Sequence, residues 1–591
     1  MTDYRPPLTD ILFVLNEVAG LPEIATFAAY PNADPEFVAG ALGEAGRFAA
    51  EVIAPLNQVG DETHSTITKG AVTTPPGFKA AYDAFVASGW PAMGFPEQYG
   101  GGGMPVVAAT AVNEMVTTAN MAFSLCPMLT YGANEMLLWH GSEEQRAAYL
   151  GKLVPGEWTS TMVLTEADAG SDVGALITKA VPQGDGTYRV TGNKIFITWG
   201  DHDLTDNIVH IVLARTPDAP RGTKGISCFI IPKFLVNDDG TVGASNNVET
   251  VSLEHKLGIH ASPTAVLAFE DSVGYLIGEE NQGMRYMFTM MNNARLQVGL
   301  QGVSVAERAY QAAVEYATER RQGRAIGAPK TEKSPIVEHP DVRRMLLLMR
   351  SQIEAGRCLV LKTAEAIDVS HHHPDEAVRT RAAERLALLT PISKAWPTDM
   401  GVEVTSLGIQ VLGGMGYIEE SGMPQHFRDA RITPIYEGTN GIQAADLVAR
   451  KLPMRGGEAV REMLEEMGEV AAFLGKIDDL ADIGTALGDA IGALAEASMG
   501  LGKMLMDDPN DALAGATPSQ EMFGLTAGGW LLGMSALAAH RLLESGDDRF
   551  LRDKIATVRF FARHLLPKVR GLLPSALAGA EGLFAIATED L

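Results

Sequence analysis

A change of hydrophobic periodicity, made twice along the chain, is the feature that most restricts how this sequence can fold. Residues 36–158 place apolar side chains at three- and four-residue intervals, as in PEFVAGALGEAGRFAAEVIAPL, which predicts helices. From about residue 160 to 280 the apolar segments are short, β-branched and aromatic, and GDG at 184–186 predicts a hairpin turn. Helical periodicity returns at Met284. We therefore expect a mainly α protein with a central β domain, an antiparallel barrel or sandwich.

The length of 591 residues alone suggests about three to four domains, and the changes of pattern divide the chain into five parts. We expect an N-terminal extension (1–35), an N-terminal helical domain (36–159), a middle β domain (160–282), a C-terminal helical bundle (283–452) and an additional C-terminal helical domain (453–591). The last part, called the appendage below, begins at the break Pro453–Gly457 and continues as amphipathic segments. We expect it to pack on the bundle and to reinforce a contact between subunits.

The balance of charge and the cysteines argue against several classes of protein. Lys and Arg total 47 against 73 Asp and Glu, a formal charge of -26, which opposes binding to nucleic acid and to anionic membranes. The three cysteines lie far apart with no CxxC pair, which excludes a cysteine-rich zinc site and fits a reducing compartment. The first residues lack the basic region of a secretory signal. We expect a cytoplasmic protein.

Two stretches suggest a membrane span and a metal site, and we interpret both differently. Met522–Ala539 carries no charge and has a borderline length for a span, but it holds four glycines and lies among polar helical segments. We expect a buried helix and no membrane insertion. The adjacent histidines 371–373 cannot share a helix face, so we expect a solvated loop between helices and no metal.

A carboxylate stands among rigid and apolar neighbours in the segment RITPIYEGTNGIQ. Glu437 directly follows Pro434, Ile435 and Tyr436. Apolar surroundings raise the pKa of a glutamate, which makes it a better base at neutral pH. The alternative is a solvated loop residue favoured by the dipole of the helix that follows. The local sequence leaves both interpretations open.

Four segments, in order along the chain, carry a resemblance to a known family. They are VLTEADAGSDVGALITKA (163–180), KIFITWGD (194–201), LGIQVLGGMGY (407–417) and RITPIYEGTNGIQ (431–443). They resemble the flavin-contacting signature, the second flavin strand, the adenine-side loop and the catalytic-base segment of acyl-CoA dehydrogenases. The resemblance covers about residues 40–452. It implies the fold of that family, noncovalent FAD, an acyl-CoA substrate, an electron-transfer flavoprotein as acceptor, and a homo-oligomer that is at least a dimer.

The resemblance also assigns roles to individual residues. It makes Glu437 the base that removes the α-proton of the thioester while a hydride passes to flavin N5, and its own backbone N–H helps to hold the thioester oxygen. The matching cofactor-binding positions are Met162, Leu164, Thr165, Ser171, Phe196, Thr198, Arg320, Gln410, Gly413, Gly414 and Thr439. The matching substrate-binding positions are Ser171, Arg295, Tyr436 and Gly438.

Some of these positions have simpler interpretations. Thr165 and Thr198 alone would be ordinary strand threonines, Ser171 a turn serine, and Arg295 a helix-surface arginine. Arg320 could be a cation at the end of its helix.

The sequence also departs from the family pattern at two places. Phe196 stands where many relatives carry tryptophan, so an indole donor is absent there. Arg321 and Gln322 replace a Lys–Thr pair, so Arg321 or Arg324 could replace Arg320 as the contact to the FAD pyrophosphate of a neighbouring subunit.

The two ends of the chain narrow the range of expected substrates. The opening YRPPLTDILFVLNEVAG and the appendage resemble a bacterial subgroup of the family from dimethylsulfoniopropionate catabolism. This resemblance implies the conversion of 3-methylthiopropanoyl-CoA to 3-methylthioacryloyl-CoA. The alternatives are a short- to long-chain fatty acyl-CoA dehydrogenase, a DNA-associated flavoprotein of the same fold with a basic C-terminal surface, and a flavin oxidase that uses molecular oxygen.

Overall fold

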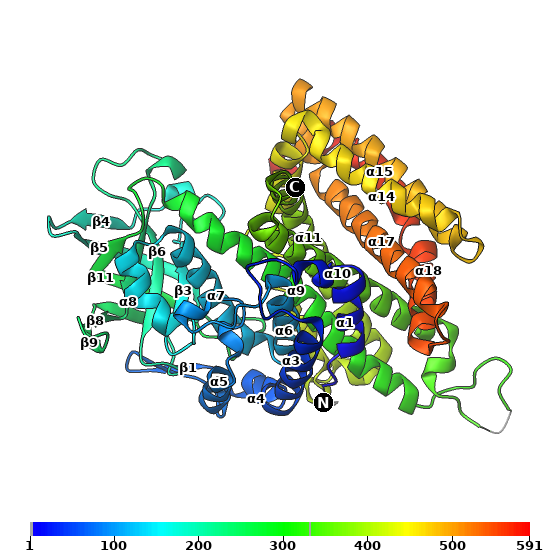
Figure 1. Cartoon of the computed structure of the whole chain (residues 1–591), viewed down its shortest axis with the longest axis horizontal. Coiled ribbons are helices and arrows are strands. Elements are labelled where there is room, and N and C mark those ends of the chain that lie inside the picture. The colour runs from blue at the N-terminus through cyan, green and yellow to red at the C-terminus, as the bar shows by residue number, and fades with distance from the viewer. Residues whose placement is uncertain (1–3, 330–331) are drawn as a thin grey trace. The chain divides into compact units, whose positions relative to one another are not determined.

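The computed structural model describes residues 4–329 and 332–591, and the chain forms two compact units that are described here separately. The sheet unit comprises Glu44–Met104 and Met115–Gln297. The bundle unit comprises the residues up to Gly43, Pro105–Glu114 and Val298–Leu591. The order of elements is helices, strands, helices and more helices, which confirms the expected fold class (Figure 1).

The main sheet runs in the order β3-β6-β7-β11-β5-β4, with β10 paired to β11. Its strands are β3 (Thr159–Val163), β4 (Lys179–Pro182), β5 (Thr187–Thr198), β6 (Ile208–Ala214), β7 (Ser227–Pro232), β10 (Val248–Leu253) and β11 (Thr264–Leu276). Short ribbons pair β1 (Thr66–Thr68) with β2 (Ala71–Thr73) and β8 (Phe234–Val236) with β9 (Val242–Ser245). The GDG turn joins β4 to β5, as predicted.

One pairing corrects the expectation of a purely antiparallel domain. Strands β3 and β6 are parallel, with Met162 opposite Ile211. A parallel pair needs a long crossover connection, and the chain between these strands supplies one that contains β4 and β5. Strand β11 pairs with β10, β5 and β7, and its register shifts between Phe269 and Ser272. Such bulges bend a strand, which helps β11 to pair with three neighbours along its length.

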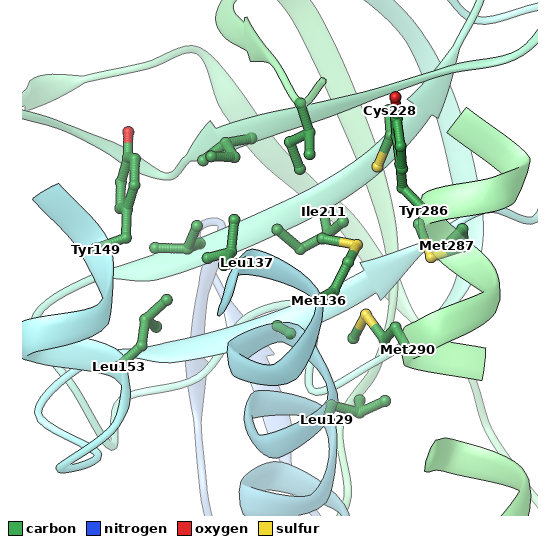
Figure 2. Close-up of a cluster of buried hydrophobic side chains, with 14 of the residues drawn as sticks. Leu129, Met136, Leu137, Tyr149, Leu153, Ile211, Cys228, Tyr286, Met287 and Met290 are labelled. Atoms are coloured by element: carbon green, nitrogen blue, oxygen red, sulfur yellow. The ribbon is translucent and has the colours of Figure 1, made fainter. Parts of the chain in front are cut away.

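Both faces of the central strands are buried, in two separate cores. Along β6, Val209, Ile211 and Leu213 belong to one core, and Val212 and Ala214 belong to the other. The first core joins the sheet to helices, and Figure 2 shows its methionines and leucines packed between strand and helix. Those helices are α7 (Met121–His140), α8 (Glu143–Leu153) and the start of α9 (Gly283–Glu319). The second core lies among the strands themselves. Strands β6 and β7, which are buried throughout, therefore read as continuous apolar runs.

The remaining helices of the sheet unit are α4 (Leu56–Thr63) and α5 (Phe78–Ala87). Helices α3 (Pro35–Phe48), α6 (Val106–Ala119) and α9 each cross a boundary between the units along the chain. The bundle unit also contains α1 (Leu8–Glu17), α2 (Leu21–Ile24), α10 (Pro340–His372), α11 (Glu376–Leu412), α12 (Met423–Ala430) and α13 (Asn440–Asp446). Helices α10 and α11 pack along each other.

The appendage forms helices that pack on the bundle, which confirms that part of the prediction. They are α14 (Glu458–Gly475), α15 (Ala481–Asp507), α16 (Pro509–Ala514), α17 (Ala516–Leu543), α18 (Arg549–His564) and α19 (Pro567–Ala576). Helix α17 contacts both α10 and α11 as well as its neighbours α15, α18 and α19 (Figure 1).

Helix α17 is the buried helix expected from the uncharged stretch. Among the described residues it is the helix that is long and apolar enough to cross a membrane, and 89% of its most apolar window is buried by the rest of the protein. A Cβ on Gly524 would lie 2.2 Å from the ring of Trp396 on α11. The glycines of this stretch therefore allow close packing in a core.

The three histidines end α10 instead of forming a loop, which corrects that expectation. His371 and His372 are its last residues and His373 is the C-cap. The ring of His372 packs edge-on against Tyr30 at 5.1 Å, and that of His373 against Phe27 at 5.4 Å. The expected loop was wrong because aromatic partners from the N-terminal segment cover this helix end. In the described part of the chain no group of three His, Cys, Asp or Glu residues is arranged to hold a metal ion.

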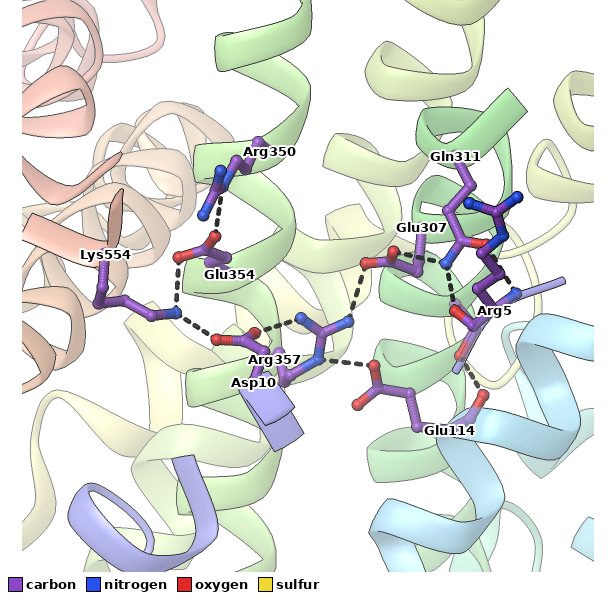
Figure 3. Close-up of polar contacts among 10 residues, drawn as sticks. Arg5, Asp10, Glu114, Glu307, Gln311, Arg350, Glu354, Arg357 and Lys554 are labelled. Atoms are coloured by element: carbon purple, nitrogen blue, oxygen red, sulfur yellow. Dashed lines mark hydrogen bonds and ion pairs between the residues drawn. The ribbon is translucent and has the colours of Figure 1, made fainter. Parts of the chain in front are cut away.

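A network of buried charges joins segments of the bundle unit that are distant in sequence, and we call it the Arg357 network (Figure 3). Arg357 donates to Glu114 at 2.7 Å, to Asp10 at 2.5 Å and to Glu307 at 2.9 Å. Lys554 of the appendage pairs with Asp10 and with Glu354, which also pairs with Arg350. Its members are Asp10, Glu114, Glu307, Arg350, Glu354, Arg357 and Lys554. The network connects α1, α6, α9, α10 and α18.

Candidate active site

The sheet unit brings the two predicted flavin threonines to neighbouring segments. Thr198 is the last residue of β5, and Thr165 follows β3 by two residues. The N–H of Ile195 donates to the carbonyl of Thr165 at 3.0 Å, which joins these two segments directly. Both threonine side chains are half-buried. Two hydroxyl groups are therefore presented from adjacent chain segments, an arrangement that can serve one planar ligand.

Phe196 is exposed at this edge of the sheet. The residue is 58% exposed and its backbone is left-handed, with φ +60°. A large apolar side chain in a strained conformation is costly, and such strain is concentrated at functional sites. Trp199, three residues later, also has a positive φ, but its ring is buried and its Nε1 donates to Ala122 O at 3.1 Å. The nearby indole therefore serves the core of the unit.

A buried ion pair that the sequence analysis did not single out fixes these segments. Glu166, next to Thr165, pairs with Lys194 at 2.8 Å, and Lys194 also donates to Leu164 O at 2.8 Å. Glu166 accepts further hydrogen bonds from Ile177 N–H and Thr178. Burial raises the pKa of Glu166, but the charge of Lys194 and these hydrogen bonds outweigh it and lower the pKa. The only signal in the sequence was a charge pair inside two flavin-like segments.

The other predicted residues of the sheet unit are less specifically placed. Met162 and Leu164 pack partly against the helical core, so their backbone is what they can offer to a ligand. Ser171 is exposed in a turn where Asp172 caps the next residues. Arg295, on α9, donates to Asn292 at 3.3 Å and lies over the ring of Phe288 at 5.9 Å.

In the bundle unit, Glu437 lies in a short closed loop. The N–H of Asn440 donates to Pro434 O at 2.9 Å, which closes the loop around Glu437. Glu437 has φ +57° and Gly438 has φ +84°. Glu437 is half-buried beside Ile435, whose side chain is 48% accessible. The predicted base therefore sits in a strained backbone with apolar side chains beside it.

The residues that flank Glu437 are hydrogen-bonded. Tyr436 donates from its hydroxyl to Gln301 Oε1 on α9. Burial and the neighbouring Glu437 carboxylate raise the pKa of Tyr436 well above its usual value, so the phenol stays neutral. Thr439 accepts a hydrogen bond from Ile442 N–H at 3.2 Å and caps α13. This cap leaves the Thr439 hydroxyl hydrogen able to donate.

The predicted adenine-side residues lie where α11 ends. Gly413 is the C-cap with φ +61°, and its N–H donates to Gln410 O. A Cβ added at Gly413 or Gly414 would meet nothing within 4 Å. Tyr417 follows with 84% of its side chain exposed. The backbone here is open to close approach by a ligand.

The arginine cluster after α9 separates into two kinds. Arg321 donates from Nη1 to Lys333 O at 2.9 Å. Within residues 4–329 and 332–591, the exposed side chains of Arg320 and Arg324 have no hydrogen bond or ion pair. These two guanidinium groups are therefore better placed than Arg321 to bind phosphate.

Taken within each unit, these groups fit FAD. The sheet unit offers hydroxyl groups beside an exposed aromatic ring, which suits a flat heterocycle. The bundle unit offers an open glycine loop and uncommitted arginines, which suit a nucleotide and its phosphates. The bundle unit also holds the predicted base.

Comparison with known proteins identifies the family. Models of the acyl-CoA dehydrogenase N-terminal, middle and C-terminal domains match residues 42–157, 161–272 and 281–452, and an acetyl-CoA dehydrogenase C-terminal-like model matches residues 463–587. The chain belongs to the acyl-CoA dehydrogenase family. It is an acyl-CoA dehydrogenase, an oxidoreductase that acts on CH–CH groups.

Two similar relatives cover most of this acyl-CoA dehydrogenase. It is 47% identical to 3-methylmercaptopropionyl-CoA dehydrogenase of Ruegeria pomeroyi over 565 residues, 95% of this chain and 96% of that protein. It is 38% identical to a butyryl-CoA dehydrogenase of Syntrophomonas wolfei over 542 residues, 88% of each chain.

Solved structures agree on the fold. Caenorhabditis elegans ACDH-11 in complex with C11-CoA superposes with a TM-score of 0.77 at 20% identity, over 96% of this chain and 94% of that chain. An acyl-CoA dehydrogenase of Bacillus anthracis complexed with FAD gives 0.74 at 20% identity, over 94% and 90%. The appendage is therefore part of a fold that other members share.

Proposed function

We propose that this acyl-CoA dehydrogenase desaturates 3-methylthiopropanoyl-CoA to 3-methylthioacryloyl-CoA, a step of dimethylsulfoniopropionate catabolism in the cytoplasm. The observation that carries the proposal is the 47% identity to 3-methylmercaptopropionyl-CoA dehydrogenase over 95% of this chain. A match over 95% of the chain must reach into both the N-terminal extension and the appendage, the parts from which the substrate was inferred.

Glu437 is the base in this proposal. The proton next to a thioester is only weakly acidic, so its removal needs a base near neutral pKa and hydrogen-bond donors on the thioester oxygen. The Glu437 N–H supplies one donor, and its left-handed backbone sets the direction of that donor. Gly438 lets the chain turn beside the substrate, and Ser171, Arg295 and Tyr436 complete the proposed substrate-binding positions.

Bound FAD would supply the acceptor, its N5 atom, for the hydride that leaves the β-carbon. Thr165, Phe196 and Thr198 would hold its ring system together with the backbone near Met162 and Leu164. Gln410, Gly413 and Gly414 would hold the adenine side, Thr439 would be a further contact to the cofactor, and Arg320 or Arg324 would bind the pyrophosphate.

We also propose the partners and the organisation that the sequence implied. An electron-transfer flavoprotein accepts the electrons, and the enzyme is at least a homodimer, reinforced by the appendage. The five-part division at residues 35, 159, 282 and 452 describes its domains; the ranges of the family matches support it.

A fatty acyl-CoA substrate is the second candidate. The observation that favours it is the 38% identity to a butyryl-CoA dehydrogenase over 88% of each chain. A DNA-associated role has no comparable support, because acidic residues outnumber basic ones in the appendage, residues 453–591.

Anaerobic titration of the purified flavoprotein tests the proposal. 3-Methylthiopropanoyl-CoA, butyryl-CoA and palmitoyl-CoA are added separately while flavin absorbance is followed. We expect the thioether substrate to bleach the flavin fastest and at the lowest concentration. Faster bleaching by butyryl-CoA or palmitoyl-CoA would contradict the proposed substrate, but the enzyme would remain an acyl-CoA dehydrogenase.

A further inference from the structure

Two side-chain tethers hold the loop of Glu437 to two different helices of the bundle unit. We infer that Gln301, Lys394 and Asn440 are positioning residues, which set the location of the Glu437 carboxylate without touching the substrate. The inference rests on the proposed function, in which Glu437 is the base. Neither the family resemblance nor the site prediction included these three residues.

The first tether is Asn440, three residues after Glu437. Its Oδ1 accepts a hydrogen bond from Lys394 Nζ at 2.8 Å. Its Nδ2 donates to Ala395 O at 3.1 Å and to Thr398 Oγ1 at 2.9 Å. Lys394 and Thr398 are both wholly buried on α11. The amide thus uses both of its ends on one helix, which fixes the position of the loop and its rotation.

The second tether is Tyr436, directly before Glu437. Its hydroxyl donates to Gln301 Oε1, and Gln301 is 1% exposed on α9. Glu437 therefore has an anchor on each side, one on α9 and one on α11. A residue held from both sides cannot relax its backbone by moving the loop.

The two anchor helices form a stiff frame because their backbones touch. A Cβ on Gly299 of α9 would lie 1.9 Å from Ser393 O of α11, and a Cβ on Gly302 would lie 2.2 Å from Pro397 O. Gln301 lies between these glycines, and Lys394 lies next to Ser393. The tethers thus attach where backbone contact sets the distance between α9 and α11. Rotation of side chains cannot change that distance.

The tethers explain how Glu437 keeps its strained conformation. A left-handed backbone at a non-glycine residue costs about 1–3 kcal/mol and persists only where the surroundings over-determine it. If the Asn440 tether is removed, the loop can relax and the carboxylate moves. A displacement of about 1 Å can slow a positioned reaction by about 10²-fold.

The test compares Asn440→Ala with the matched control Thr405→Val in the flavin-loaded enzyme. Thr405 is also buried on α11, but among the described residues its hydroxyl bonds only within that helix, to Gly401 O at 2.8 Å and Val402 O at 3.1 Å. We expect Asn440→Ala to lower kcat by about 10- to 100-fold with KM and flavin content unchanged. We expect Thr405→Val to keep the wild-type kcat.

A second readout is independent of turnover. Amide hydrogen exchange of residues 432–440 should be faster in Asn440→Ala than in Thr405→Val, because only the first variant frees the loop. Thr398→Val removes the hydrogen bond between the Thr398 hydroxyl and Asn440 without leaving a cavity, so it is the fallback if Asn440→Ala does not fold. We expect it to lower kcat and speed exchange in the same direction as Asn440→Ala, but by less.

The outcomes separate this inference from the proposed function. Wild-type kcat and wild-type exchange in Asn440→Ala and Thr398→Val would overturn the positioning role. A rise in KM or a loss of flavin equal to the loss of kcat would also overturn it, because it would indicate general damage. Full activity in Glu437→Gln would instead overturn Glu437 as the base.

Discussion

The loop of Glu437 and the Arg357 network are both polar clusters of the bundle unit, and they differ in charge and in exposure. Glu437 is half-buried and has a strained backbone, and side-chain hydrogen bonds hold its loop, one of them donated by the buried ammonium group of Lys394. The Arg357 network is a set of fully formed ion pairs deep in the helices (Figure 3). In our proposal the first cluster serves the substrate, whereas the ion pairs of the second join α1 and the appendage to the bundle. Buried charge alone is therefore a poor guide to chemistry in this protein.

The largest effect on the rate of flavin bleaching should come from the conservative substitution Glu437→Gln. Glu437→Gln keeps the size of the side chain and removes its basicity, so flavin bleaching should slow by at least about 10²- to 10⁴-fold. Flavin content and the unfolding temperature should stay as in the wild type. Stopped-flow absorbance measures the bleaching rate and thermal unfolding measures the unfolding temperature. A variant that keeps most of the wild-type bleaching rate would show that Glu437 is not the base.

Arg357→Met should give the opposite pattern. It leaves Asp10, Glu114 and Glu307 buried without their shared partner, which should cost about 3–5 kcal/mol of stability. The protein that folds should bleach at the wild-type rate. Urea unfolding followed by circular dichroism measures the loss. An unchanged unfolding curve would mean that the network does not hold the bundle together.

Asp10 should make the stability depend on acid. Burial raises the pKa of the Asp10 carboxyl, but the charges of Lys554 and Arg357 outweigh it and lower the pKa from 3.8 to about 2. Because the folded pKa is the lower one, the stabilisation is complete above pH 3.8 and is lost as the pH falls towards 2. It corresponds to about 2 kcal/mol. Wild type and Asp10→Asn, compared by urea unfolding at pH 6 and pH 3, should differ less at pH 3; an equal difference would contradict the assignment.

An ion pair on the surface should contribute much less to stability than the buried Arg357 network. Lys79 pairs with Asp83 at 2.7 Å on the surface of α5, with more than half of each side chain accessible. Lys79→Met should change the unfolding free energy by less than about 1 kcal/mol, since surface ion pairs contribute little. A loss as large as that of Arg357→Met would show that burial does not decide the strength of these pairs.

The order of elements was predictable from sequence because it depends on local patterns. Helical and strand periodicities located the helical and β segments but not the two compact units, and four motifs supplied the candidate residues Glu437, Thr165, Thr198 and the glycine loop. The parallel pairing of β3 with β6 was missed because short apolar strands do not reveal their partners. The histidines at 371–373 were misplaced because their aromatic partners come from the start of the chain.

The anchors of the site were not predictable for a similar reason. Gln301 and Tyr436 are 135 positions apart, and Lys394 and Asn440 are 46 apart. A lone glutamine, lysine or asparagine in a helical segment has no pattern that indicates such a partner. The choice among Arg320, Arg321 and Arg324 likewise needed the hydrogen bond of Arg321 to Lys333.

The ion pair between Asp10 and Lys554 also limits when the first helix can complete its contacts during protein synthesis. The two residues are separated by 544 positions, so Asp10 leaves the ribosome long before its partner exists. At about 5–20 residues per second, the wait is about half a minute or more. During that time Arg357 can join Glu114 and Glu307, but the first helix has no cation from the appendage to complete its site. The start of this protein is thus among the last segments that can reach their final surroundings.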